Sequence, residues 1–225
     1  MTADEPRLPA RGTQRNTPAA GPLPAAIEAL IGATGRFLAA QAPPFITATA
    51  VPWLDSTQRR AVQPGSLPVV RHLAGCLTAA PPAMRPLVGA LHTAAGALAW
   101  AQTYSAQQMS PQFLEGYGWT ELAGLNGAVV SRECAVGFLI LGPGIEYPPH
   151  HHEALELYLP LAGRATWWRA QGGWQEVEPG ATVLHAPWEP HAMRTGSEPL
   201  LALYLWHSGN LDQHAELTDR QPTGG

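Results

Sequence analysis

The sequence predicts a mainly β protein with helices at its N-terminal end, and two observations lead to this fold class. From Asn126 onward, short segments rich in Val, Leu and aromatic residues alternate with Gly and Pro, as closely spaced antiparallel strands do. Before that point, Ala-rich segments carry apolar residues at helical spacing. We therefore expect a C-terminal β-barrel or sandwich on which an N-terminal helical region packs.

The chain before the barrel divides into an arm and a helical region. Residues 1–21 are polar and Pro-rich and lack periodicity, which predicts a disordered arm. Residues 22–124 are expected to form the helical region. Its predicted elements are helices at 23–42, 68–79 and 83–106 and a connector at 43–66 with one helical turn near residues 55–62.

Residues 107–124 carry three aromatic side chains, Phe113, Tyr117 and Trp119. These side chains would either attach the helices to the barrel or form a lid over its mouth. We favour attachment, because large aromatic side chains contribute more often to packing than to gating.

The barrel is expected to occupy residues 125–208, with a polar tail at residues 209–225. The run from Ala170 to Trp174 contains two consecutive glycines and predicts a hairpin turn. Strands are predicted at 127–133, 135–142, 145–151, 155–162, 164–170, 174–178, 181–185, 190–195 and 199–206.

Composition excludes several classes of function. The formal net charge of −4 gives no electrostatic argument for binding nucleic acid. All 13 basic residues are arginine, so the chain has neither a Schiff-base lysine nor a P-loop lysine. A strand–helix Gly-x-Gly-x-x-Gly signature is missing too. Nucleotide and pyridoxal chemistry are therefore not expected.

Cysteine usage and hydropathy predict a cytoplasmic protein that does not associate with membranes. Cys76 and Cys134 stand alone in apolar surroundings, as reduced and buried thiols do. The chain shows neither a signal-peptide pattern nor an apolar run of membrane-spanning length.

The segment from Gly144 to Gly163 is the most informative part of the chain. It holds three consecutive histidines, and alternation along a strand would point His150 and His152 to one face and His151 to the other. Glu156 follows four residues after His152 and would complete a set of ligands. Imidazole and carboxylate ligands suit one divalent transition metal ion such as Zn, Fe, Mn, Ni or Cu. The alternative is a solvated histidine tract without function.

A second segment, from Gly180 to His191, supports the metal site. A glycine turn leads into a short apolar strand, a proline corner and then His191. His191 is the natural fourth ligand after His150, His152 and Glu156. The other histidines of the barrel, His185 and His207, have the wrong phase or position for a ligand, although either would be able to line the pocket.

These two segments resemble the two motifs of the cupin superfamily. Gly144, His150, His152, Glu156 and Gly163 fit the first motif without a gap. In the second motif, Gly180 and His191 have the right separation. Three positions of the second motif depart from the pattern: Pro187 comes one place late, Trp188 replaces a glycine and Thr195 replaces an asparagine. The resemblance implies a cupin (double-stranded β-helix) barrel.

A narrower resemblance rests on Tyr147-x-x-His150-x-His152-x-x-x-Glu156-x-Tyr158, with PHHHEALELY at its centre. This pattern is similar to the bacterial cupin-type dimethylsulfoniopropionate (DMSP) lyases, which also carry a helical region before the cupin. The resemblance implies a metal-dependent carbon–sulfur lyase that releases dimethyl sulfide and acrylate. The metal would act as a Lewis acid on the substrate carboxylate. Tyr158 would remove the α proton, and Tyr147 would orient the substrate or assist.

The substrate implied by the resemblance is a small zwitterion or carboxylate, and aromatic faces bind onium cations. Among the tryptophans of the barrel, Trp188 is the best candidate for a wall of the site because it lies near His191. Cupins commonly pair through sheet edges, so the resemblance also allows a homodimer.

Two rival functions use the same residues. Another cupin metalloenzyme, such as an Fe(II) dioxygenase or an isomerase, would need the same four ligands. A cupin without catalytic activity would bind a small ligand as a sensor or store. A DNA-binding sensor is disfavoured, since the helical region lacks a basic recognition face.

Overall fold

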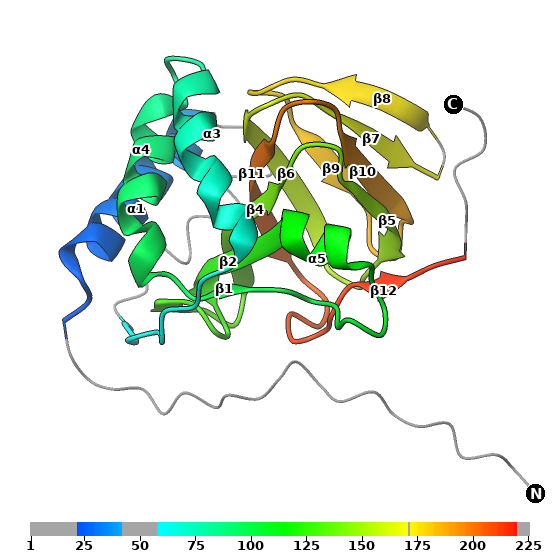
Figure 1. The fold of residues 1–225 in the computed structure, drawn as a ribbon. Helices are drawn as coiled ribbons and strands as arrows, with labels where there is room; N and C mark the ends of the chain where they lie inside the picture. Colours follow the sequence, from blue (N-terminus) through cyan, green and yellow to red (C-terminus); the bar gives the residue numbers. More distant parts are fainter. Residues whose placement is uncertain (1–21, 42–57, 171, 220–225) are drawn as a thin grey trace, which may run out of the picture.

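Two antiparallel sheets form the body of the protein, and a group of helices covers the outer face of the larger sheet (Figure 1). The computed structural model describes residues 22–41, 58–170 and 172–219. The seven-stranded sheet contains β1 Trp100–Ala101, β2 Tyr117–Gly124, β3 Val129–Val130, β4 Cys134–Leu141, β6 Leu155–Ala162, β9 Val183–His185 and β11 Leu200–His207. The five-stranded sheet contains β5 Glu146–His151, β7 Ala165–Arg169, β8 Gly173–Val177, β10 His191–Thr195 and β12 Glu216–Leu217.

The strand order is that of a jelly roll. Eight successive strands, from β4 to β11, distribute themselves as β4-β11-β6-β9 in one sheet and β5-β10-β7-β8 in the other. This double Greek-key arrangement is the one that cupins use. The prediction of a mainly β fold with N-terminal helices and a C-terminal cupin barrel is confirmed. The strands β1, β2 and β3 extend the larger sheet at one edge, and β12 extends the smaller sheet.

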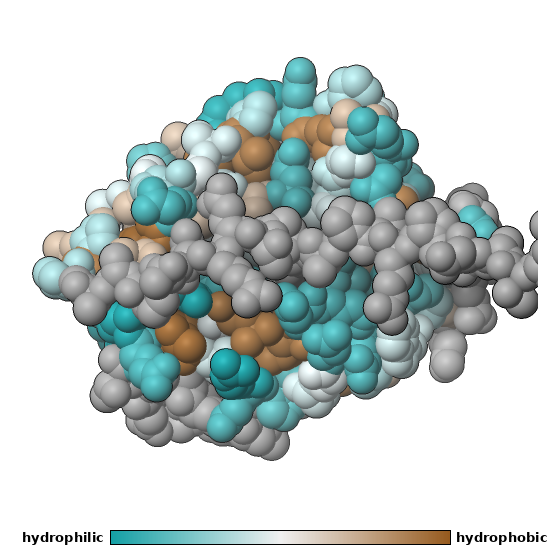
Figure 2. All heavy atoms as spheres, turned by 90° about the horizontal axis from the view of Figure 1, so that it is seen from below, coloured by the Kyte–Doolittle hydropathy of each residue, from teal (hydrophilic) through white to brown (hydrophobic). Residues whose placement is uncertain are grey.

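Alternation along β6 separates the structural core from the site. Leu157 and Leu159 belong to the hydrophobic cluster that includes the helices. Tyr158 belongs to the second cluster, between the two sheets. Because successive strand side chains point to opposite faces, Glu156 faces the interior of the barrel together with Tyr158. On the outside, apolar side chains appear among polar ones on the face seen from below (Figure 2).

The helical region is built from α1 Ala25–Gln41, α3 Leu73–Ala79 and α4 Arg85–Ala94, with 3-10 turns at η1 Pro68–His72 and η2 Ala95–Ala97. The α1 and α4 helices pack on each other beside the larger sheet (Figure 1). A short helix, α5 Pro111–Gly116, begins after Ser110, whose hydroxyl accepts a hydrogen bond from the Phe113 amide. In the ranges that the structure describes, no helix is both long and apolar enough to cross a membrane.

The helix predicted at 83–106 is too long. Its real counterpart, α4, ends at Ala94, and Leu98 already has an extended backbone. Trp100 and Ala101 then pair with β2. The Ala-rich composition favours a helix through this stretch, but strand pairing satisfies the same backbone groups and overrides the local preference.

The two sheets include strands on both sides of the predicted barrel range, 125–208. The eight residues of β2 pair with β4, so this part of the expected helical region belongs to the larger sheet. In the expected polar tail, Leu211 is buried and β12 pairs with β5. The expected arm at 1–21 and most of the expected connector lie outside the described residues. Residues 58–62, where a helical turn was expected to end, contain no helix, and Arg59 forms a bridge with Val129.

Two motif glycines provide a matched test of this fold. Both have positive φ angles, 67° at Gly144 and 77° at Gly163. A Cβ at Gly144 would meet no atom within 4 Å, whereas at Gly163 it would overlap the Pro199 carbonyl. We expect Gly144→Ala to lower the free energy of unfolding by about 1–2 kcal/mol, the cost of the left-handed backbone. Gly163→Ala should cost roughly 3 kcal/mol or more. Equal losses in urea denaturation would contradict the close approach at Gly163.

Candidate functional site

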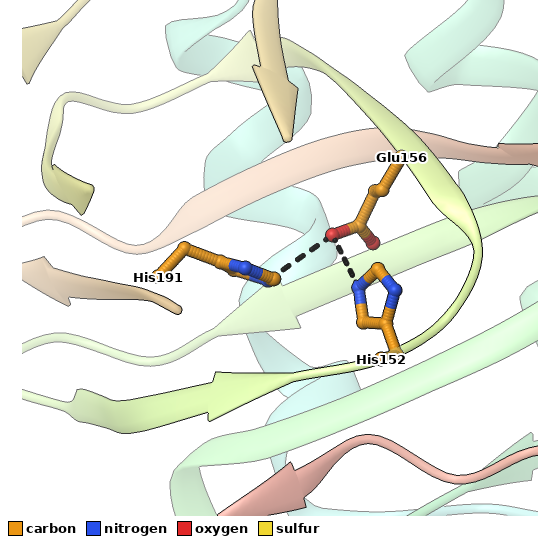
Figure 3. Close-up of side chains that lie close together, drawn as sticks. All are labelled: His152, Glu156 and His191. Carbon is orange, nitrogen blue, oxygen red and sulfur yellow. Dashed lines mark hydrogen bonds and ion pairs between the residues drawn. The ribbon is translucent and has the colours of Figure 1, made fainter. Parts of the chain in front are cut away.

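Three buried side chains from separate parts of the barrel converge on one point (Figure 3). Glu156 lies on β6, His152 follows directly after β5 and His191 begins β10. One oxygen of the carboxylate, Glu156 Oε2, is 3.0 Å from His152 Nε2 and 3.2 Å from His191 Nε2. The potential ligand atoms all lie within 4.8 Å of one another. This arrangement of two imidazoles and one carboxylate has the composition of a metal-binding triad.

Backbone carbonyls determine which nitrogen of each imidazole faces this point. His150, His152 and His191 each place Nδ1 within hydrogen-bonding distance of a carbonyl oxygen. A carbonyl only accepts, so each Nδ1 carries a proton, and Nε2 is the nitrogen through which each ring would bind a metal ion. The acceptors are the carbonyls of Pro148, Ala154 and Glu189, at 2.8, 2.9 and 2.8 Å respectively.

The carboxylate at the centre of this group would be stabilised by a cation. Burial is the largest influence on Glu156 and raises its pKa, but the charges and hydrogen bonds of His152 and His191 outweigh it and hold that pKa well below its usual value. Glu156 is therefore ionised. A cation among Glu156 Oε2 and the Nε2 atoms of His152 and His191 would neutralise this buried carboxylate. The residues present therefore fit a divalent metal ion.

His150, the remaining expected ligand, lies beside the triad. Its ring stacks on Tyr147, with the ring centroids 3.8 Å apart, and its centroid is 4.2 Å from that of His191. Burial and then the neighbouring charge of His191 lower the pKa of His150 well below its usual value, so the ring is neutral. His150 is not among the three residues whose ligand atoms converge, and its role as a fourth ligand stays a prediction.

A pocket opens next to the triad and has about 440 Å³ of empty space, including its mouth. Glu156 and both expected catalytic residues, Tyr147 and Tyr158, line it. The other lining residues are Thr103, Tyr117, Trp119, Ala135, Leu139, Tyr204, Trp206 and Ala215. The wall is thus mainly aromatic, and four of its side chains are tyrosines.

Trp206 is a site residue that the sequence did not indicate. Its indole N–H donates to Glu156 Oε1 over 2.6 Å, and its ring centroid is 4.2 Å from that of His152. Trp206 therefore holds one carboxylate oxygen while the other faces the two imidazoles. The alternation of side chains along β11 could have indicated that Trp206 points into the barrel. Its position opposite Glu156, however, depends on the pairing of β11 with β6.

Trp188 does not form a wall of this pocket, contrary to the sequence prediction. Its side chain is 49% exposed, and its ring lies against that of His151, with centroids 5.6 Å apart. The backbone explains the difference, because Trp188 occupies the motif's glycine position and has a φ of 62°. His151 points away from the triad as expected, and its Nε2 is 3.7 Å from Glu216 Oε2.

His185 lies closer to the site than its phase suggested. Its ring stacks on that of His191 with a centroid separation of 3.9 Å, and the side chain is fully buried. Burial and then the charge of His191 lower the pKa of His185 well below its usual value. His185 therefore supports the ring of His191 as a neutral group.

Comparison with known proteins agrees with this geometry. The model of the dimethylsulfoniopropionate lyase family matches residues 50–202. The chain belongs to this family. It is 35% identical over 126 residues to the DMSP lyase DddQ of Ruegeria pomeroyi, an alignment that covers 56% of this chain and 62% of the relative. It is 28% identical over 147 residues to the putative DMSP lyase DddL of Cereibacter sphaeroides, covering 62% of this chain and 59% of the relative. The alignments thus span less than two thirds of either relative.

Solved structures of DMSP lyases extend the likeness to nearly the whole fold. The crystal structure of DddQ from Ruegeria pomeroyi DSS-3 matches with a TM-score of 0.79 at 28% identity, covering 89% of this chain and 98% of that one. A chain from the crystal structures of the DMSP lyases RdDddP and RnDddQII matches with a TM-score of 0.75 at 30% identity, covering 87% and 98%. The helical region therefore belongs to the same fold as the barrel.

The role of Trp206 is testable through metal affinity. We expect Trp206→Phe to weaken divalent-metal binding by about 10- to 100-fold, because the variant keeps the ring but loses the donor that orients Glu156. Chelator competition measures the affinity. Trp174→Phe is the matched control, since Trp174 lies on β8 beneath the Arg194 guanidinium. Equal affinities in the two variants would contradict the role given to the indole N–H.

Proposed function

We propose that this protein is a metal-dependent lyase that cleaves the carbon–sulfur bond of DMSP to give dimethyl sulfide and acrylate. The observation that supports the proposal best is the shared pocket. Glu156 of the triad and Tyr158 line the same cavity, so a metal-binding carboxylate and a candidate base face one substrate. Membership of the DMSP lyase family supplies the substrate.

The reaction balances with a single base. Tyr158 takes the proton from the carbon α to the carboxylate, and the electron pair of that C–H bond forms the double bond of acrylate. The C–S bond breaks at the β carbon, and its electron pair leaves with sulfur as neutral dimethyl sulfide. Because sulfur departs from a sulfonium, the leaving group needs no proton.

The main difficulty for this base is its pKa. Burial, and then the negative charge of Glu156, raise the pKa of Tyr158 well above its usual value of about 10. A divalent ion on the triad would supply positive charge that both polarises the substrate carboxylate and favours the Tyr158 phenolate. The phenol therefore becomes a competent base only in the loaded protein.

The aromatic wall suits the other end of the substrate. A sulfonium is a desolvated cation without hydrogen-bond donors, and aromatic faces attract such groups. Trp119 and Tyr204 line the pocket beside Tyr158. We assign the sulfonium to these rings, in place of the wall that the sequence assigned to Trp188.

Headspace chromatography tests the proposed function. Purified protein with a divalent metal and DMSP should release dimethyl sulfide, and chelation should stop the release. Acrylate in equal amount would confirm elimination as the route. No dimethyl sulfide with any of Zn, Fe, Mn, Ni or Cu would contradict the proposal.

Tyr158→Phe tests the assigned base. The variant should keep its bound metal but lose on the order of 100- to 10,000-fold in kcat, the usual contribution of general-base catalysis. Tyr204→Phe is the matched comparison, because Tyr204 pairs with Tyr158 across the strands and lines the same pocket. It should lose far less. Retention of full turnover in Tyr158→Phe would refute the role of Tyr158.

The triad supports a second candidate function. Two histidines and one carboxylate also form the set that binds Fe(II) in oxygenases. An oxygenase would consume oxygen with a carboxylate substrate when iron is bound. An oxygen electrode separates the two functions, since elimination from DMSP consumes no oxygen.

A further inference from the structure

Tyr147 stands at the end of a chain of hydrogen-bonded side chains that runs along the pocket wall. Trp119 Nε1 donates to Thr103 Oγ1 over 3.1 Å. Thr103 Oγ1 lies 2.9 Å from the Tyr117 hydroxyl. That hydroxyl donates to the Tyr147 hydroxyl over 3.5 Å. All four residues line the pocket.

Elementary donor and acceptor rules give this chain a direction. An indole N–H only donates, so Thr103 accepts at its oxygen and has one proton to give. The Tyr117 proton goes to Tyr147, so the Thr103 proton must go to Tyr117. Every proton in the chain therefore points toward the Tyr147 oxygen.

The proton of Tyr147 itself is thereby released for another acceptor. The hydroxyl of Tyr104 lies 3.1 Å from that of Tyr147, and either group can be the donor. A substrate carboxylate is a stronger acceptor than a phenol, so Tyr147 would donate to the carboxylate and accept from Tyr104 when substrate is bound. With both lone pairs engaged, a phenol oxygen can only donate further. The pocket places Tyr147 beside Glu156 and Tyr158, where the reacting end of a substrate would lie.

We propose that Thr103 and Tyr117 are positioning residues that turn Tyr147 into a hydrogen-bond donor for the substrate carboxylate. The inference rests on the proposed function, because it assigns one end of the DMSP molecule to Tyr147. A hydrogen bond to a charged acceptor is stronger than one between neutral groups. It strengthens further as negative charge builds on the carboxylate oxygens during removal of the α proton.

Thr103→Val tests the chain at its second member. The variant keeps the shape of Thr103 but removes the link to Tyr117, and we expect kcat/KM to fall by about tenfold, the scale of one hydrogen bond to a charged group. Thr103→Ser restores the hydroxyl and should restore the rate. Thr93→Val is the matched control, because the Thr93 hydroxyl donates a hydrogen bond to the Gly89 carbonyl within α4. If Thr103→Val retains the wild-type rate, the inference is wrong.

A double-mutant cycle shows whether Thr103 acts through Tyr147. In the Tyr147→Phe background, Thr103→Val should cause no further loss, because the group that it positions has already gone. A merely structural role for Thr103 would make the two losses add. Additive losses would overturn the inference even if both single variants are slow.

Propionate binding separates this inference from the proposed function. Calorimetric titration of the metal-loaded protein with propionate reports on carboxylate binding without turnover. Thr103→Val should raise the Kd for propionate by about tenfold. A wild-type protein that releases dimethyl sulfide, with an unchanged propionate Kd in Thr103→Val, would refute the inference alone. A wild-type protein that releases none, with the Kd still dependent on Thr103, would refute the proposed substrate alone.

Discussion

The site depends on three backbone carbonyls that hold the Nδ1 protons of His150, His152 and His191. These hydrogen bonds leave each Nε2 available as a metal ligand, and two of the Nε2 atoms face the ionised carboxylate of Glu156. The carbonyl of Pro148 lies within β5, that of Ala154 follows β5, and that of Glu189 precedes β10. The jelly-roll path therefore does more than place ligands near one another, because it also selects the ring nitrogen that each ligand presents.

Burial makes the ionised form of Glu156 costly unless its oxygens have partners. An ionised carboxylate that is as buried as Glu156 needs a partner for each oxygen. Trp206 provides the partner for Oε1, and a cation at the triad would provide the partner for Oε2. Burial, and then the charge of Glu156, also raise the pKa of Tyr158, so the proposed base depends on the charge at the metal site. The hydrogen-bonded hydroxyls of Thr103, Tyr117 and Tyr147 carry no charge. In our proposal they orient the Tyr147 proton without adding a buried charge to the site.

Local patterns in the sequence predicted most of the barrel and the triad. Strands such as 155–162 agree with β6 because Gly and Pro mark the joints and apolar residues fill the interior. His152, Glu156 and His191 follow from motif spacing. Trp206 and Thr103 did not, since their partners lie far away in the chain and depend on strand pairing. The overlong helix at 83–106 and the wrong placement of Trp188 have separate origins. Pairing with β2 makes residues 100 and 101 a strand, whereas a left-handed backbone turns the Trp188 side chain outward.

A crystal structure of the metal-loaded protein, with anomalous scattering to locate the ion, tests the central claim most directly. The account predicts one ion within about 2.0–2.2 Å of His152 Nε2, His191 Nε2 and a Glu156 oxygen, the usual range for imidazole and carboxylate ligands. All Nδ1 atoms should remain on their carbonyls. An ion bound through Nδ1, or one bound away from Glu156, would contradict the account.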